Sequence, residues 1–312
     1  MKSYEIEKVL LAIDFSPTSY NALETAIGIC KRHQASLTLL HVLENAYVLY
    51  PPEAGGAANM VLADLTKSAS DNLNGLAMKL AAKHKIEVNY LVQSGNPADE
   101  ICRGAHHSKA NLIVLGTHGS SGLREFFIGS NAYRVVKNAP CPVMSVPGTN
   151  QWTDFKKMLF PVRMIPHALD KYDIIRPIIR KNGSSLFIAG IVNRNDAIGV
   201  IEMCPLINTI QTKIAEDDVI CGSEVYFCEV VAKQVLAVSN LEKPDLIVIT
   251  ATLDTTIKEF FLGPYTQDIV NHAKFPVLSI RPEVSKTSTA YLTSMVKKAR
   301  PLSAMFYESS SQ

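Results

Sequence analysis

Glycines and hydroxyl-bearing residues in one segment suit the binding of a phosphate-bearing ligand. In GTHGSSGLREFFIGS, Gly116 and Gly119 would let the backbone turn tightly and approach a ligand without a Cβ in the way. Gly129 and Ser130 stand where a helix is expected to begin, and the unpaired N–H groups and dipole of a helix start favour an anion. The Ser130 hydroxyl and the Asn131 amide suit either a helix cap or donation to phosphate oxygens. A structural loop that leads into a capped helix is the alternative interpretation.

An acidic residue, Asp14, directly follows the apolar run VLLAI, at the start of DFSPTSYNAL. Its carboxylate is able to accept hydrogen bonds from a ribose or a base. Ser16 suits the N-cap of a helix and Pro17 its first position, so a helix is expected to start here. The other interpretation makes Asp14 a loop or capping residue.

Several familiar sites do not occur in the sequence. There is no GxxxxGK[ST] phosphate loop, and the turn after the first predicted strand reads DFSPTS rather than GxGxxG. No GxSxG elbow or cysteine–histidine signature supports nucleophilic catalysis. His106 and His107 are consecutive, so on a helix they would point about 100° apart, and no third ligand stands at a useful spacing. We therefore expect no catalytic nucleophile and no metal site built from protein ligands alone.

The elements that must position these residues alternate between strands and helices. The runs VLLAI, LTLLHV, EVNYLV, LIVLG and VMSV are short and nearly continuous, which is typical of parallel strands covered on both faces. Between them, SYNALETAIGICKRH and SASDNLNGLAMKLAAKH have apolar residues every three or four positions, as in amphipathic helices. This alternation predicts an α/β, Rossmann-like fold, with a doubly wound open parallel sheet of five strands and helices on both faces. Ligands bind such sheets beyond the carboxyl ends of the strands, where the strand order switches.

The chain contains this pattern twice. EKVLLAID aligns with KKMLFPVR, and ASLTLLHVL with SSLFIAGIV, at a shared offset of 149 residues. NLIVLG aligns with DLIVIT, and APCPVMSV with AKFPVLSI, at an offset of 134 residues. Two pairs at each offset indicate an internal repeat. The second copy is shorter by fifteen residues, lost between its second and fourth strands.

At 312 residues, the chain is long enough for two domains of ordinary size. We predict a first domain at residues 1–147, a linker rich in turn-forming residues at 148–155, a second domain at 156–282 and a C-terminal extension at 283–312. The extension matches nothing in the first copy. Its basic, weakly amphipathic character favours a solvated tail, with docking on a partner or a membrane surface as the alternative.

The composition restricts the compartment and the class of partner. Hydrophobic residues make up 47% of the chain and charged residues 19%, an ordinary globular balance. A formal net charge of +2 and a pI near 8.1 give no reason to expect nucleic acid as a partner. The six cysteines show no CxxC spacing, so free buried thiols in a reducing compartment are expected. No stretch resembles a signal peptide or reaches the ~18 apolar residues of a membrane span, which predicts a cytoplasmic protein without membrane contact.

The loop and the repeat together resemble the universal stress protein family in its tandem form, with two such domains in one chain. The nucleotide-binding members of that family carry G-x2-G-x9-G-[ST], which is fitted without a gap by Gly116, Gly119, Gly129 and Ser130. The acidic residue after the first strand, the HV pair that ends the second and SGNPADEI after the third also match. The resemblance covers residues 5–147 and, more faintly, 155–282.

This resemblance implies that the first domain binds ATP, together with Mg²⁺ or Mn²⁺. Asp14 would face the adenosine, and the backbone of Val42 would read the edge of the adenine. The ribose and the phosphates would be held by the loop and the helix start, that is by Gly116, Gly119, Gly129, Ser130 and Asn131. His118 is a candidate for a contact to ribose or phosphate. Arg124 is a candidate for a bidentate phosphate contact, with an exposed ion pair to Glu125 as its alternative.

The second copy departs from the family pattern. By the alignment, Asp14, Gly116, Gly119 and Ser130 are replaced by Arg163, Thr250, Leu253 and Pro264, and only Gly263 stays in register. Larger side chains would occupy the space of the phosphates, and a proline removes one N–H donor. We therefore expect the second domain not to bind ATP in the family's manner, and a different anion at Arg163 remains open. The motif KEFFLG parallels REFFIG, which we interpret as an apolar anchor of the loop in both copies.

These observations favour an ATP-binding regulator of a stress response, whose second half is structural or binds a partner. Slow ATP hydrolysis is an alternative, although only Arg124 and a metal ion would stabilise charge and no base is evident. A nucleotide-independent protein-interaction module is another. The last strands, PVMSV and PVLSI, leave sheet edges that need pairing. In the family such edges pair across domains or subunits, which implies an internal pseudo-dimer and leaves a homodimer and a protein partner of unknown identity open.

Overall fold

The computed structural model describes residues 4–44, 56–117, 130–148, 150–165, 170–251, 253–254, 261–262 and 264–281. The first half contributes five strands, β1 (Lys8–Ala12), β2 (Ser36–Glu44), β3 (Val88–Gly95), β4 (Leu112–Gly116) and β5 (Val143–Val146). Its helices are α1 (Pro17–His33), α3 (Gly56–His84), α4 (Pro97–Ser108) and α5 (Ser130–Asn138).

The second half repeats this order of elements. Its strands in the main sheet are β6 (Lys157–Val162), β7 (Ser185–Asn193), β8 (Cys221–Cys228), β9 (Leu246–Thr250) and β12 (Val277–Ile280). Its helices are α6 (Asp170–Asn182), α7 (Ala197–Ala215), α8 (Val231–Glu242) and α9 (Pro264–His272). The short strands β10 (Leu253–Asp254) and β11 (Phe261–Leu262) pair antiparallel in a separate ladder.

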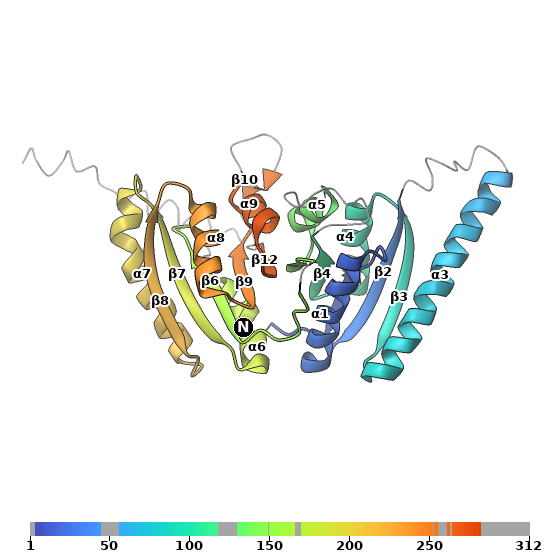
Figure 1. The fold of residues 1–312 in the computed structure, drawn as a ribbon, viewed down its shortest axis with the longest axis horizontal. Helices are drawn as coiled ribbons and strands as arrows, with labels where there is room; N and C mark the ends of the chain where they lie inside the picture. Colours follow the sequence, from blue (N-terminus) through green and yellow to red (C-terminus); the bar gives the residue numbers. More distant parts are fainter. Residues whose placement is uncertain are drawn as a thin grey trace, which may run out of the picture.

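All ten main strands belong to one sheet, in the order β3-β2-β1-β4-β5-β12-β9-β6-β7-β8. Each half has the doubly wound order that the sequence predicts. The halves meet where β5 and β12 pair antiparallel, with Met144 opposite Leu278, so the two expected five-stranded sheets are continuous (Figure 1). This pairing covers the edges that the sequence leaves open, and the outer edges of the sheet are β3 and β8.

Apolar side chains alternate between the two faces of the central strands, which is why both faces are covered by helices. Leu10 and Ile113 pack in a cluster with residues of α4 and α5. Leu11 and Val114, the next residues along, pack in a second cluster with residues of α1 and α3. The nearly continuous apolar runs of the sequence therefore correspond to strands buried on two sides.

The start of α1 forms as its sequence predicts. Ser16 is the N-cap, and its Oγ accepts a hydrogen bond from the Ser19 N–H at 3.2 Å. Pro17 takes the first helical position, where a missing N–H costs nothing. The helix ends at His33, and its C-cap, Gln34, adopts the left-handed conformation with φ 58°.

The length difference between the halves lies between the second and third strands. There are 43 residues between β2 and β3 and 27 between β7 and β8. The third and fourth strands are 16 residues apart in the first half and 17 in the second. Most of the loss is thus in the helix, because α3 has 29 residues and α7 has 19. In Figure 1 these two helices lie at opposite ends of the molecule.

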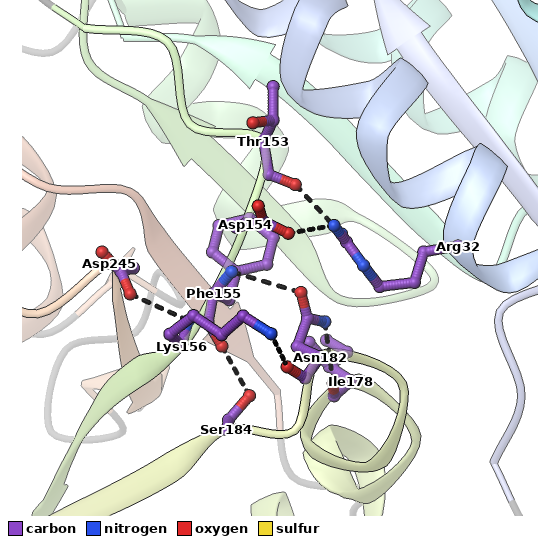
Figure 2. Close-up of polar contacts among 9 residues, drawn as sticks. All are labelled: Arg32, Thr153, Asp154, Phe155, Lys156, Ile178, Asn182, Ser184 and Asp245. Carbon is purple, nitrogen blue, oxygen red and sulfur yellow. Dashed lines mark hydrogen bonds and ion pairs between the residues drawn. The ribbon is translucent and has the colours of Figure 1, made fainter.

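The predicted linker is a packed segment with specific contacts to both halves (Figure 2). On the first half, Arg32 of α1 donates to the Thr153 carbonyl at 3.0 Å and forms an ion pair with Asp154. On the second half, the fully buried Phe155 donates its N–H to Asn182 Oδ1 at 3.2 Å. The junction therefore holds α1 against the entry to β6.

Candidate nucleotide-binding site

Three of the predicted site residues lie at the carboxyl ends of neighbouring strands, at one edge of the sheet. Leu11 pairs with Val114, so continuing this register by two residues places Ile13 opposite Gly116. Ala12 pairs with Leu40, so Asp14, two residues after the end of β1, lies at the same end of the sheet as Val42. Since β1 and β4 are the strands at which the order switches, this edge is where a doubly wound sheet binds its ligand.

Asp14 is exposed, and its carboxylate also organises the start of α1. Asp14 Oδ1 accepts hydrogen bonds from the Ser16 N–H at 3.0 Å and from Ser16 Oγ at 2.6 Å. Ser16 Oγ lies 2.9 Å from Thr18 Oγ1, which continues the chain of polar groups. Asp14 therefore has the capping role considered from the sequence. Its hydrogen bonds with Ser16 also hold its exposed carboxylate at the edge of the sheet.

Gly116, the last residue of β4, allows α1 to approach the strand closely. A Cβ at this position would lie 3.1 Å from both the carbonyl carbon and the oxygen of Thr18. Backbone atoms at this distance cannot move aside as a flexible side chain does. The glycine is therefore explained by the packing of α1 against β4, and its contact with a ligand stays a prediction.

Val42 lies near the end of β2, which extends beyond β1. The Leu40 carbonyl accepts from the Ile13 N–H at 2.9 Å, and the backbone groups of Val42 point the same way as those of Leu40. The N–H and carbonyl groups of Val42 therefore point toward the β1 side of β2, at a level beyond the last residue of β1. Next to Val42, His41 Nδ1 lies 2.8 Å from the Ile13 carbonyl, and the His41 ring lies 4.9 Å from that of Phe15. These contacts tie the loop after β1 to β2.

The start of α5 coincides with the predicted anion-binding helix terminus. Ser130 is the first residue of α5, and the half-buried Asn131 is the second. N–H groups in the first turn of a helix have no partner within the helix. The other predicted contacts, His118, Gly119, Arg124 and Gly129, lie outside the described residues, as does the REFFIG motif.

Thr18 is a residue of this edge that the sequence did not reveal. Besides its contact with Gly116, it lies close to the linker, since a Cβ on Gly148 would be 2.7 Å from Thr18 Cγ2. Asn21, one turn later, donates its Nδ2 to the Pro147 carbonyl at 2.7 Å. The small residues and hydroxyls of SPTSYN hint at close packing, but their partners lie more than 95 residues away in the sequence.

The corresponding edge of the second half has a different chemistry. Arg163 follows β6 directly, in the place of Asp14, and its Nη2 lies 3.4 Å from the Thr250 carbonyl. The Arg163 guanidinium carbon lies 3.5 Å from the centre of the Tyr265 ring. Pro264, in the place of Ser130, is the first residue of α9 and has no N–H to donate. A cation thus replaces the carboxylate at this point.

The described part of the chain contains no cluster of three or more His, Cys, Asp or Glu side chains that suits a metal ion. The rings of His106 and His107 are near each other, with centroids 6.1 Å apart. Within the same residues, no helix is both long and apolar enough to cross a membrane. All six cysteines are free thiols. The expectation that they are buried is confirmed for Cys30 and Cys228, whereas Cys102, Cys141 and Cys221 are half-buried. It is wrong for Cys204, which is exposed because it lies on the outer face of α7.

Comparison with known proteins agrees with the geometry. Residues 5–147 match the model of the universal stress protein family. A universal stress protein of Methanocaldococcus jannaschii is 33% identical over 141 residues, which are 45% of this chain and 81% of that protein. The universal stress protein YxiE of Bacillus subtilis is 33% identical over 147 residues, which are 45% of this chain and 97% of that protein.

The arrangement of both halves is also found in a solved structure. A universal stress protein of Archaeoglobus fulgidus superimposes with a TM-score of 0.70 and 17% identity, over 90% of this chain and 99% of that chain. This likeness shows the shared fold of the whole tandem arrangement. From the sequence relatives and the family match, the chain belongs to the universal stress protein family.

Proposed function

We propose that this protein is an ATP-binding regulator of a stress response and that its first half holds the nucleotide. The observation that carries the proposal is that β1, β2 and β4 are neighbours at the switch point, with Asp14, Val42 and Gly116 all at their carboxyl ends. An adenosine site at this point needs an exposed carboxylate, here Asp14, and backbone groups without a strand partner, here those of Val42. It also needs a glycine close to the ligand, here Gly116.

The residues present fit ATP in their chemistry. The Asp14 carboxylate would accept hydrogen bonds from the ribose, and the Val42 backbone would pair with the adenine edge. Asn131 and the N–H groups of the first turn of α5 would donate to phosphate oxygens, with Ser130 and the predicted loop contacts. Bound Mg²⁺ or Mn²⁺ would offset phosphate charge.

The differences between the halves make the proposal asymmetric. A guanidinium has only donors, so Arg163 is unable to accept the ribose hydrogen bonds expected at Asp14. Thr250 is a β-branched residue at the position of Gly116. We therefore propose one ATP site per chain, with the second half supporting the first through the shared sheet and the packed junction.

A melting experiment with matched variants tests the proposal. With Mg-ATP at a hundred times its Kd, the folded state gains about 2.7 kcal/mol, enough to raise the Tm measurably. Asp14→Ala is expected to abolish most of this rise, whereas Asp64→Ala, an exposed aspartate on α3, is expected to keep it. An unchanged Tm in wild type, or an equal rise in Asp14→Ala, would count against the site.

A further inference from the structure

The hydrogen-bond ladder between β1 and β2 ends just before the candidate site. Its last pair is Ala12 and Leu40. The next residue, Ile13, still donates its N–H to the Leu40 carbonyl at 2.9 Å. In a regular parallel ladder, the Ile13 carbonyl would then accept the Val42 N–H. The ladder, whose two strands are fully described, stops before that bond, so the Ile13 carbonyl has a different partner.

The partner of this carbonyl is a side chain, that of His41. His41 Nδ1 lies 2.8 Å from the Ile13 oxygen. Because a carbonyl only accepts hydrogen bonds, Nδ1 carries the proton and donates it. The imidazole thus takes the acceptor that a longer ladder would offer to the next residue of β2, Val42. Within the described ladder, the Val42 N–H is therefore left for another acceptor.

The second half contains the same segment without the histidine. At the repeat offset of 149 residues, Gly190 stands in the place of His41. The ladder between β6 and β7 runs one pair further than its counterpart and ends with Val162 opposite Gly190. In this register, the Val162 carbonyl is the acceptor for the N–H of Ile191, which corresponds to Val42. The repeat therefore shows the longer ladder where the imidazole is missing.

Packing explains why only one half carries a ring at this position. A Cβ on Gly190 would lie 2.7 Å from Ile207 Cδ1 and 3.0 Å from Met203 Sδ, so side chains of α7 leave no room for an imidazole. In the first half, the His41 ring lies 4.9 Å from that of Phe15. Phe15 has a left-handed backbone, with φ 63°, which is rare for a bulky residue and is found most often at ligand sites. The ring and its support thus belong to the half with the candidate site.

We propose that His41 is a positioning residue that keeps the Val42 N–H free and thereby selects adenine as the base. The inference rests on the proposed ATP site. Beyond the end of β1, the N–H and carbonyl of Val42 present a donor beside an acceptor on one side of β2. Adenine offers the matching pair, N1 as acceptor and its amino group as donor, whereas guanine offers the reverse, N1–H and O6. A site built to make such hydrogen bonds rejects a base that leaves them unpaired. His41 therefore acts on base choice through Val42.

Hydrogen exchange of the Val42 amide, followed by NMR in the full chain without nucleotide, tests the free N–H. In wild type, Val42 is expected to exchange at least about tenfold faster than Ile191, which lies inside its ladder. His41→Leu removes the donor, so the ladder is expected to lengthen and Val42 exchange to slow by about tenfold or more. His41→Asn, whose Nδ2 takes the place of Nδ1, is expected to keep the exchange fast. A protected Val42 in wild type, or unchanged exchange in His41→Leu, overturns the proposal.

The preference for ATP over GTP tests the role in base selection. By calorimetry, His41→Leu is expected to lose about tenfold of this preference, because one hydrogen bond to adenine is lost, and to bind tripolyphosphate as wild type does. His41→Asn is expected to keep the preference, as is His107→Leu, at an exposed histidine of the same half. An unchanged preference in His41→Leu overturns the role in base selection.

The two measurements separate this inference from the proposed function. If wild type binds no ATP, the proposed function and the selection of adenine fail together. The exchange of Val42 then still decides whether His41 shortens the ladder. Should His41→Leu unfold, as judged by circular dichroism, His41→Val takes its place with the same expected results.

Discussion

Thr18 lies so close to Gly116 that a Cβ at residue 116 would make an unusually tight contact with its backbone. A Cβ on Gly116 would be 3.1 Å from the backbone carbonyl of Thr18, and a Cβ on Gly148 would be 2.7 Å from its Cγ2. Thr18 therefore lies between the end of β4 and the start of the junction, in the first turn of the helix that begins at the candidate site. Thr18 therefore lies next to both the candidate site and the junction.

Gly116→Ala is expected to lower the free energy of unfolding by about 1–2 kcal/mol, because the new Cβ overpacks against backbone atoms. It should also reduce the Tm rise caused by Mg-ATP, since the start of α1 must shift. Urea unfolding measures the first effect. Gly222→Ala in β8 is the control, because its Cβ would make an ordinary contact at 3.5 Å with Phe187. Equal stability of the two variants would show that α1 does not pack on β4 as described.

Gly28→Ala tests the contact between α1 and the junction. Inside a helix, this change normally stabilises by about 0.5–1 kcal/mol. Here the Cβ would be 2.9 Å from the Thr153 carbonyl oxygen, so we expect destabilisation instead. Gly75→Ala in α3, where no atom lies within 4 Å, should show the normal gain. If both variants become more stable in urea unfolding, the packed junction is not present in solution.

Lys171→Met is expected to stabilise the protein near neutral pH. Burial, and then the nearby Arg163, lower the pKa of Lys171 well below its usual value. The unfolded chain therefore binds the proton more readily, and wild type gains stability as the pH rises toward the unfolded pKa of about 10.4. The advantage of Lys171→Met should shrink between about pH 8 and pH 10. Lys233→Met, at an exposed lysine, is the control, and a parallel trend in both variants would contradict the burial of the Lys171 amine.

Asp217 should make the second half sensitive to acid. Although burial opposes ionisation, hydrogen bonds from Arg176, Tyr172 and Arg180 lower the pKa of Asp217 from 3.8 to about 2. The stability it contributes is complete above the unfolded pKa and is lost as the pH falls through the folded one. Relative to Asp217→Asn, wild type should therefore lose Tm as the pH falls from about 4 to 2. The exposed neighbour Asp218→Asn should follow wild type, and a flat difference for Asp217→Asn would contradict the network.

Local sequence patterns were sufficient to predict the strands, the doubly wound order and the start of α1. Buried parallel strands leave continuous apolar runs, and a Ser-Pro pair specifies a helix start regardless of distant contacts. The pairing of β5 with β12 was implied by the family resemblance, because in that family such edges pair across domains or subunits. Asp14 and Gly116 were brought together by topology alone, since β1 and β4 are neighbours in such a sheet.

Contacts between distant residues were not predictable in the same way. Arg32 and Asp154 are 122 residues apart, and turn-forming residues around Asp154 indicate a linker whether or not it packs. The closeness of Thr18 to Gly116 depends on how α1 lies on β4, which no local pattern specifies. The closeness of the buried Lys171 to the half-buried Arg163 was missed, because one lies on a helix and the other follows a strand.

The stoichiometry of ATP binding tests the central claim most directly. Equilibrium dialysis of the full chain with Mg-ATP, in wild type, Asp14→Ala and Arg163→Met, counts the sites and assigns them to a half. We expect one ATP per chain in wild type and in Arg163→Met, and none in Asp14→Ala. Two ATP molecules per chain, or one that Asp14→Ala retains, would contradict an ATP site in the first half alone.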